Sequence, residues 1–222
     1  RGTLVHEMMA HLWSKLGDHA VLEVATAADC EALIAEAVST ALARAGRDRG
    51  DALKGRMGEI ERQRLAALAR AWLEFERRRP AFTVVAIEQK HAVTLGGITV
   101  NVRLDRMDRI ATPAGPRHVV IDYKTGQASV KAWLGERPDE PQLPLYAVGR
   151  SGPEPIDGAA FARLRTGDLR FAGMARDQDL IAGVDPIQKA APALGDWDRA
   201  VVAWREALSA LGRGFATGDA EV

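Results

Sequence analysis

A change of hydrophobic pattern at Pro80 constrains the fold of this chain more than any other feature. Up to Arg79, apolar residues recur at the three- and four-residue spacing of helices, whereas from Phe82 onward they alternate as in strands. Proline cannot continue a helix, so the change falls at a defined position. The sequence therefore predicts a helical N-terminal part over residues 1–80, followed by a β-sheet.

Three helices are predicted before Pro80. The first covers residues 3–16, and the second starts at a Thr26–Asp29 capping box and ends at Gly46. A polar stretch, Gly46–Gly58, is predicted to be a loop. The long third helix then runs to Arg79, with a predicted apolar stripe of Met57, Ile60, Leu65, Leu68, Trp72 and Phe75.

The rest of the chain predicts a sheet with few helices. Phe82–Ile87 and Ala92–Leu95 lead through a Gly96-Gly97 turn into a strand over Ile98–Ile110, the pattern of a β-hairpin. Further elements are a strand ending near Lys124, a helix from Gln142, strands at Ala159–Leu164 and Leu169–Met174, and a closing helix over residues 197–217. This order predicts one α/β domain over residues 1–222, with a central mixed β-sheet flanked by helices and a sheet core over 81–176.

Two carboxylates and a lysine stand out near the strand ends. Asp122 and Lys124 are two residues apart on an extended segment, so their side chains share a face, and Asp105 lies on the preceding strand. Carboxylates are hard oxygen ligands suited to Mg²⁺. The chain has 24 arginines and six lysines, so lysine is an uncommon choice here for generic positive charge. We therefore expect Asp105, Asp122 and Lys124 to be catalytic.

These residues, with Gln142 and Tyr146 downstream, resemble the PD-(D/E)xK nuclease superfamily, in the branch of the RecB and AddB-type recombination nucleases. That branch also has an N-terminal histidine after a glycine, and Gly2 to His6 has this form. The pieces occur in the order of the family over residues 1 to about 150. The resemblance implies a restriction-endonuclease-like core.

The resemblance also implies a role for each residue. Lys124 holds the attacking water and stabilises charge on the phosphate, and Gln142 and Tyr146 bind the DNA strand. Four groups are expected to hold Mg²⁺, or Mn²⁺ in its place: His6, Asp105, Asp122 and the backbone carbonyl of Tyr123.

Two features depart from the family. Val102 stands where many members have glycine, and Cys30 is the one cysteine, whereas several AddB-type members carry four. A complete four-cysteine iron–sulfur site is therefore excluded within these residues.

Other candidates have simpler explanations. Asp108 alternates away from Asp105, which favours a structural ion pair with Arg106 or Arg109. Glu88, just after an apolar strand, is an alternative outer ligand of the cation. Glu136 and Asp139 are expected in a loop, and Trp133 in the core beneath it.

The net charge of zero conceals an asymmetry. Residues 44–79 contain eleven basic and six acidic residues, which fits either a DNA-binding surface or a solvated helix face with internal ion pairs. Apolar runs are far shorter than a membrane span, and one cysteine is compatible with a reducing compartment, so a cytoplasmic protein without a membrane segment is expected. The chain begins with Arg1 rather than methionine, and a helical pattern follows immediately, so we expect the chain to be a piece of a longer polypeptide.

The sequence thus predicts a metal-dependent DNA nuclease of the exonuclease type, with DNA as substrate. The resemblance implies a function in DNA repair and recombination beside a helicase subunit. Three alternatives are open: a catalytically inactive, nuclease-like DNA-binding or assembly module of a helicase–nuclease complex, a hydrolase of another phosphoester, and a structural α/β domain with accidental motifs.

Overall fold

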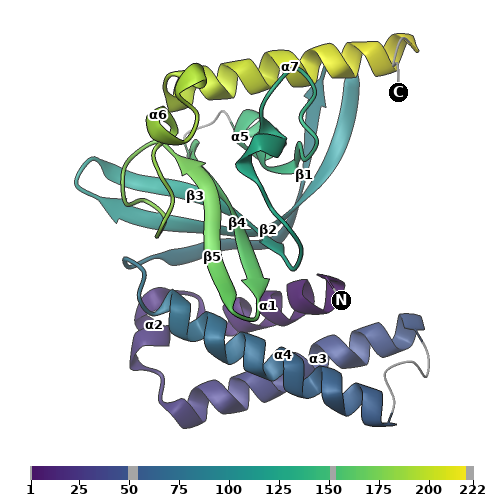
Figure 1. Ribbon diagram of the computed structural model, residues 1–222, viewed down its shortest axis with the longest axis vertical. Coiled ribbons are helices and arrows are strands. Elements are labelled where there is room, and N and C mark those ends of the chain that lie inside the picture. The colour runs from purple at the N-terminus through teal and green to yellow at the C-terminus, as the bar shows by residue number, and fades with distance from the viewer. Residues whose placement is uncertain (1, 50–54, 151–153, 219–222) are drawn as a thin grey trace.

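The computed structural model describes residues 2–49, 55–150 and 154–218 of the chain. Its N-terminal part is a layer of helices on one face of the sheet (Figure 1). The helices of this layer are α1 (Gly2–Leu16), α2 (His19–Val24), α3 (Ala27–Arg49) and α4 (Gly55–Glu76). The predicted capping box is present at the start of α3, since the backbone N–H of Asp29 donates to Thr26 Oγ1 at 3.2 Å. The short helix α2 was not predicted.

Five strands form one mixed sheet in the order β1-β2-β3-β4-β5. The strands are β1 (Thr83–Leu95), β2 (Ile98–Thr112), β3 (Gly115–Lys124), β4 (Ile156–Arg165) and β5 (Asp168–Ala175). Neighbouring strands are antiparallel except β3 and β4, which are parallel and joined by a helical crossover. The prediction of an α/β fold with a central mixed sheet is therefore confirmed.

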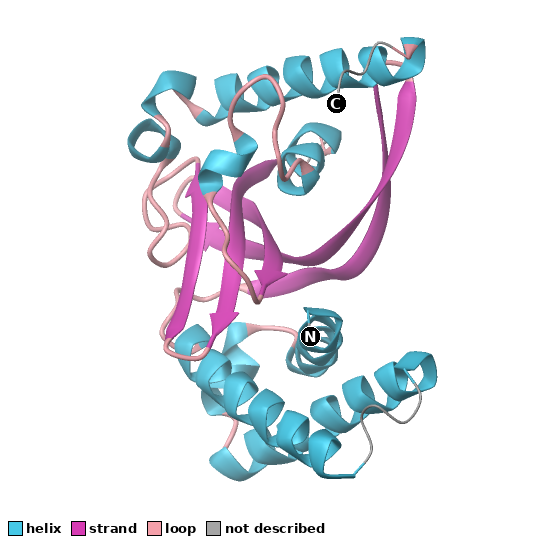
Figure 2. Ribbon diagram, turned by 45° about the vertical axis from the view of Figure 1, so that its right-hand side comes forward, coloured by secondary structure: helices cyan, strands magenta, loops and turns pink. Residues whose placement is uncertain are grey.

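A second helical layer covers the other face of the sheet (Figure 2). It consists of the 3₁₀ helices η2 (Val130–Trp133) and η3 (Pro192–Leu194) and the α-helices α5 (Gln142–Gly149), α6 (Ile187–Ala190) and α7 (Trp197–Thr217). Trp133 is fully buried in this layer, as predicted, and its carbonyl accepts a hydrogen bond from Trp204 Nε1 at 2.9 Å. The sheet thus separates two apolar cores, one on each face.

Two predictions about the helical layer are wrong. Helix α3 continues past Gly46 to Arg49 and α4 starts at Gly55, so the predicted Gly46–Gly58 loop is shorter, and residues 50–54 of it lie outside the described residues. Met57 and Ile60 are 61% and 51% exposed, because the buried face of α4 passes through Glu61, Leu65, Leu68 and Trp72. Ile60 precedes Glu61 by one position, which turns it about 100° around the helix, away from the core.

The β1–β2 hairpin reaches α7 through a contact between two glycines. A Cβ atom on Gly212 would lie 2.4 Å from the carbonyl oxygen of Leu95, and one on Gly96 would lie 2.2 Å from that of Ser209. Gly96 also has φ of +58°, in the left-handed region. The tip of the hairpin therefore packs backbone to backbone on α7.

We expect Gly212→Ala to lower the free energy of unfolding by about 1–3 kcal/mol, since the added methyl group forces the hairpin off α7. Gly214→Ala is the matched control in the same helix, because a Cβ there meets no atom within 4 Å. That change should raise stability by up to about 1 kcal/mol through helix propensity. Urea denaturation of both variants measures the difference, and equal effects would contradict the close approach.

Candidate active site

The two predicted carboxylates lie on neighbouring strands. The β2–β3 ladder ends at the pair Arg106↔Ile121, and Asp105 and Asp122 are the residues directly beyond this pair on the two strands. Past this pair, Asp105 Oδ2 accepts a hydrogen bond from the backbone N–H of Tyr123 at 2.8 Å. Asp105 and Asp122 are 6% and 3% exposed. The end of this ladder thus buries two acids next to each other.

One cavity of about 390 Å³ brings most of the predicted residues together. Those lining it are His6, Asp105, Asp122, Tyr123, Lys124 and Gln142. Tyr146 lies beside this cavity but does not line it, and its hydroxyl donates to the carbonyl of Gln89 at 3.2 Å. Residues from α1, β2, β3 and α5 therefore converge on one site.

His6 comes from α1, on the opposite side of the site from α5. Its Nδ1 lies 3.3 Å from Asp105 Oδ1. Burial alone would lower the pKa of His6, but the hydrogen bond to Asp105 and the charges of Asp105 and Asp122 outweigh it and raise the pKa. The imidazole therefore shares its environment with both carboxylates.

Asp122 carries an incompletely satisfied carboxylate. Among the described residues, no group makes a hydrogen bond of good geometry to its buried Oδ2 atom, although Lys124 Nζ lies 3.3 Å away. Burial and the charge of Asp105 raise the pKa of Asp122 from 3.8 to about 6, in spite of Lys124 and His6, which lower it. Two acids and an imidazole around an unsatisfied buried oxygen are a donor set that fits a divalent cation.

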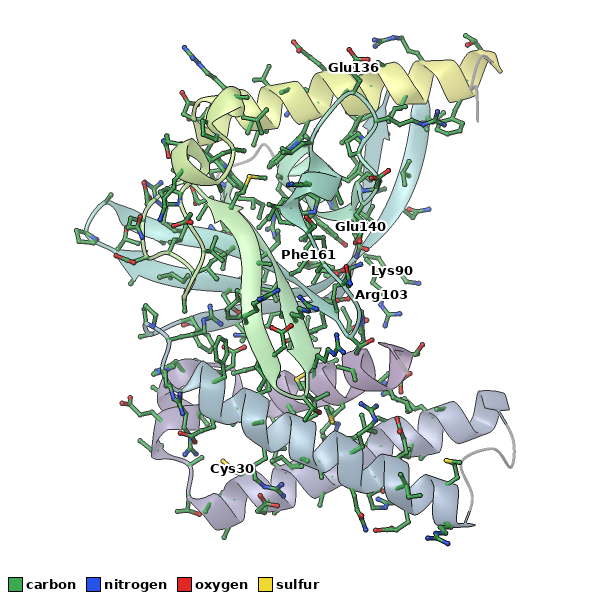
Figure 3. The ribbon with its side chains drawn as sticks, in the orientation of Figure 1. Cys30, Lys90, Arg103, Glu136, Glu140 and Phe161 are labelled. Atoms are coloured by element: carbon green, nitrogen blue, oxygen red, sulfur yellow. The ribbon has the colours of Figure 1, made fainter. Side chains whose placement is uncertain are left out.

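Lys124 contacts two acids. Its Nζ lies 2.7 Å from Glu140 Oε2, closer than it lies to Asp122, and 5.2 Å from the centre of the Phe161 ring. Burial lowers the pKa of Lys124, but the hydrogen bond to Glu140 and the charge of Asp122 raise it overall. Figure 3 shows Glu140 and Phe161 on the same side of the sheet, between β4 and the second helical layer. No local pattern in the sequence indicated this contact of Glu140 with Lys124.

Glu88 lies closer to the site than the sequence indicated. Its carboxylate, His6 and Asp105 each offer one ligand atom, and these atoms lie within 4.8 Å of one another. Glu88 is on β1 between Ile87↔Arg106 and Gln89↔Leu104, so it faces Asp105 across the strand pair. Its φ of +53° is rare for a residue other than glycine and costs about 1–3 kcal/mol. An alternation pattern cannot reveal such a backbone conformation.

Gln142 and Tyr146 lie one helical turn apart on α5, as their spacing predicted. Gln142 Nε2 donates to the carbonyl of Arg103 at 2.8 Å, which ties the start of α5 to β2. Burial is the main cause that raises the pKa of Tyr146, with added repulsion from Asp105 and Asp122. Gln142 thus holds α5 against β2, the strand of Asp105, and Tyr146 holds it against β1, the strand of Glu88.

The opposite face of β2 carries a buried charge network. Asp108 pairs with Arg106, with 2.6 Å between Arg106 Nε and Asp108 Oδ1, which confirms the predicted structural ion pair. Arg106 also donates to Glu76 of α4 at 2.7 Å, and Arg79 contacts both Glu76 and Asp108. Alternation along β2 therefore sends Asp105 to the site and Arg106 into the core below it.

Several basic residues of the segment 44–79 make ion pairs on the helical layer. Arg70 pairs with Glu31, Arg64 with Glu61, and Arg77 with Glu74. These pairs favour the solvated-face interpretation for this part of the surface.

Comparison with known proteins gives one family. A family model described as the PD-(D/E)XK nuclease superfamily matches residues 1–217, nearly the whole chain. Comparison with curated protein sequences gives no match. Within the described residues, no helix combines the length and apolarity that a bilayer crossing requires. The match extends over all the elements that build the site, and the chain belongs to the PD-(D/E)XK nuclease superfamily.

Proposed function

We propose that this chain hydrolyses DNA phosphodiester bonds with the help of a divalent cation. The observation that supports this best is the convergence of Asp105, Asp122 and Lys124 on one cavity in a chain of a nuclease superfamily. His6, Asp105, Asp122 and the carbonyl of Tyr123 are the proposed ligands of Mg²⁺, or of Mn²⁺. When bound, the cation supplies Lewis-acid activation of water and neutralises charge on the phosphate.

The proposed roles of Lys124, Gln142 and Tyr146 follow from their positions. The ammonium of Lys124, beside Asp122, can orient a water by hydrogen bonding and stabilise negative charge that builds on the phosphate oxygens. Gln142 lines the cavity and can contact the sugar–phosphate backbone. Tyr146 lies on the same helix, and its hydrogen bond to the carbonyl of Gln89 holds that helix, and with it Gln142, against β1. None of these groups reads a base edge, so we expect weak sequence preference.

The type of nuclease and its cellular role are part of the same proposal. The RecB and AddB-type resemblance favours an exonuclease that trims strands in DNA repair and recombination beside a helicase partner. His6 supports this branch, because it comes from a helix N-terminal to the sheet and approaches Asp105.

The proposal is tested by cation removal. Linear labelled DNA should be degraded in the presence of Mg²⁺, and EDTA should stop degradation, because the clustered carboxylates then repel the phosphate. Added Mg²⁺ should restore it. Labelled RNA and a small phosphodiester run in parallel identify the substrate class. DNA that is bound but never cut with any divalent cation would favour the inactive DNA-binding or assembly module.

A further inference from the structure

Arg103 occupies the boundary between two hollows in the surface. It lines the site cavity and also a neighbouring groove of about 460 Å³, and Lys124 and Gln142 are likewise shared by both. Its side chain is 62% exposed. A strand whose reacting phosphate lies in the cavity would place an adjoining phosphate along this boundary. A guanidinium there has the donor geometry that phosphate requires.

The charge of Arg103 is already compensated. Its guanidinium forms a close ion pair with the carboxylate of Glu88 across the β1–β2 pair. The same carboxylate belongs to the cluster of ligand atoms with His6 and Asp105. The Glu88 side chain is only 21% exposed, so its carboxylate would be costly to leave without a cationic partner. Glu88 is therefore within reach both of Arg103 and of the ligand atoms that would hold a divalent cation.

A second observation concerns Asp122, on the other side of that cluster, whose Oδ2 lies 3.3 Å from Lys124 Nζ. The buried Oδ2 of Asp122, which lines the same cavity as His6 and Asp105, accepts no well-formed hydrogen bond from the described residues. Asp122 and Glu88 thus flank Asp105 from β3 and β1. A divalent ion between them would satisfy Asp122 and would draw Glu88 away from Arg103.

We propose that Glu88 is an exchangeable metal ligand: it pairs with Arg103 in the metal-free protein, moves to the divalent cation when one binds, and so frees Arg103 for a DNA phosphate. This inference rests on the proposed function. Because linkage is reciprocal, the cation strengthens DNA binding through Arg103, and DNA strengthens cation binding by the same factor.

The experiment measures two affinities without relying on cleavage. Calorimetry gives the affinity for Ca²⁺, a hard cation that takes oxygen ligands. Fluorescence anisotropy gives the affinity for a short labelled DNA strand with and without Ca²⁺, at fixed ionic strength, and a gel verifies that the strand stays intact. Each is measured for the wild type, Glu88→Gln, Arg103→Ala and the double variant.

We expect Glu88→Gln to weaken Ca²⁺ binding about tenfold and to strengthen Ca²⁺-free DNA binding about tenfold, because Arg103 is released. Arg103→Ala should instead strengthen Ca²⁺ binding several-fold, because Glu88 no longer has a competing partner. In the double variant, the gain in Ca²⁺-free DNA binding from Glu88→Gln should vanish. Ca²⁺ should enhance DNA binding about tenfold less in either single variant than in the wild type.

Two controls separate this exchange from general charge effects. Lys90 faces Arg103 in the β1–β2 register and lies beside it in Figure 3, so Lys90→Ala removes a neighbouring positive charge. Glu136→Gln removes an exposed negative charge on the loop near α7. Both controls should leave the Ca²⁺ enhancement at its wild-type value.

Unchanged Ca²⁺ affinity and unchanged enhancement in Glu88→Gln would overturn the exchange, while cation-dependent cleavage by the wild type would still stand. A wild type that binds no divalent cation would overturn both the exchange and the proposed function.

Discussion

Replacing Asp122 with asparagine is expected to stop DNA cleavage and, at neutral pH, to stabilise the metal-free protein. The amide loses the charge that the cation requires, and metal activation contributes several kcal/mol to such reactions. At 1.36 kcal/mol for each factor of ten, cleavage should fall by about a thousandfold or more. Cleavage of labelled DNA at saturating Mg²⁺ measures this loss.

The gain in stability follows from the pKa of Asp122. Burial and Asp105 raise this pKa from 3.8 to about 6, so the folded protein holds a proton that the unfolded chain has already released, a penalty of about 3 kcal/mol above pH 6. Below about pH 4 both states are protonated and the penalty is absent. The stability advantage of Asp122→Asn should therefore be near zero at pH 4, grow up to pH 6, and remain constant above it.

Thermal melting without metal, at several pH values, tests this window. Asp139→Asn is the matched control, because Asp139 is an exposed loop carboxylate next in the chain to Glu140, which contacts Lys124. The stability of Asp139→Asn relative to the wild type should not rise comparably between pH 4 and pH 6. Mg²⁺ should stabilise the wild type and not Asp122→Asn, since ligand binding adds to stability only where the site is intact. An asparagine variant that still cuts DNA would refute the role of Asp122.

Arg106→Met is expected to lower the free energy of unfolding by about 3–5 kcal/mol. Arg106 and Arg79 balance Glu76 and Asp108, and all four side chains are at most 1% exposed. Removal of one guanidinium leaves two buried carboxylates with one partner. At about 2–4 °C per kcal/mol for a chain of this size, the melting temperature should fall by about 10 °C or more.

A charge-balanced variant separates charge from packing. Arg106→Met combined with Asp108→Asn leaves Glu76 paired with Arg79, whose groups lie 2.5 Å apart. We expect the double variant to lose less stability than Arg106→Met. An equal loss would show instead that the packing of the guanidinium on the Trp13 ring, 3.8 Å from its centre and absent from both variants, dominates.

The buried charge network also makes the stability of the protein depend on pH. Burial would raise the pKa of Glu76, but the charges of Arg106 and Arg79 outweigh it and lower the pKa. Its contribution to stability is therefore complete above the usual pKa of a glutamate and is lost in acid, as the pH falls through the folded-state pKa.

Local sequence patterns gave correct predictions where the direction of a side chain follows from its neighbours in the chain. Alternation along β2 predicted opposite faces for Asp105 and Asp108, and Asp108 does pair with Arg106. The Gly96-Gly97 turn predicted the hairpin, and β1 and β2 meet there. The predicted stripe of α4 failed at Met57 and Ile60, because these two side chains lie on a face of the helix that the described residues leave exposed.

The sequence by itself determined the long helices and the strands apart from their exact ends, the mixed α/β fold and the opposite faces of Asp105 and Asp108 on β2, because periodicity and spacing are local properties. Only the tertiary structure placed Glu88 beside His6 and Asp105, Glu140 against Lys124, and the hairpin tip on Gly212 of α7. These contacts depend on a left-handed residue inside β1, on the β2–β3 register and on the approach of α5 and α7. Each arises from packing between segments far apart in the chain, which no local pattern encodes.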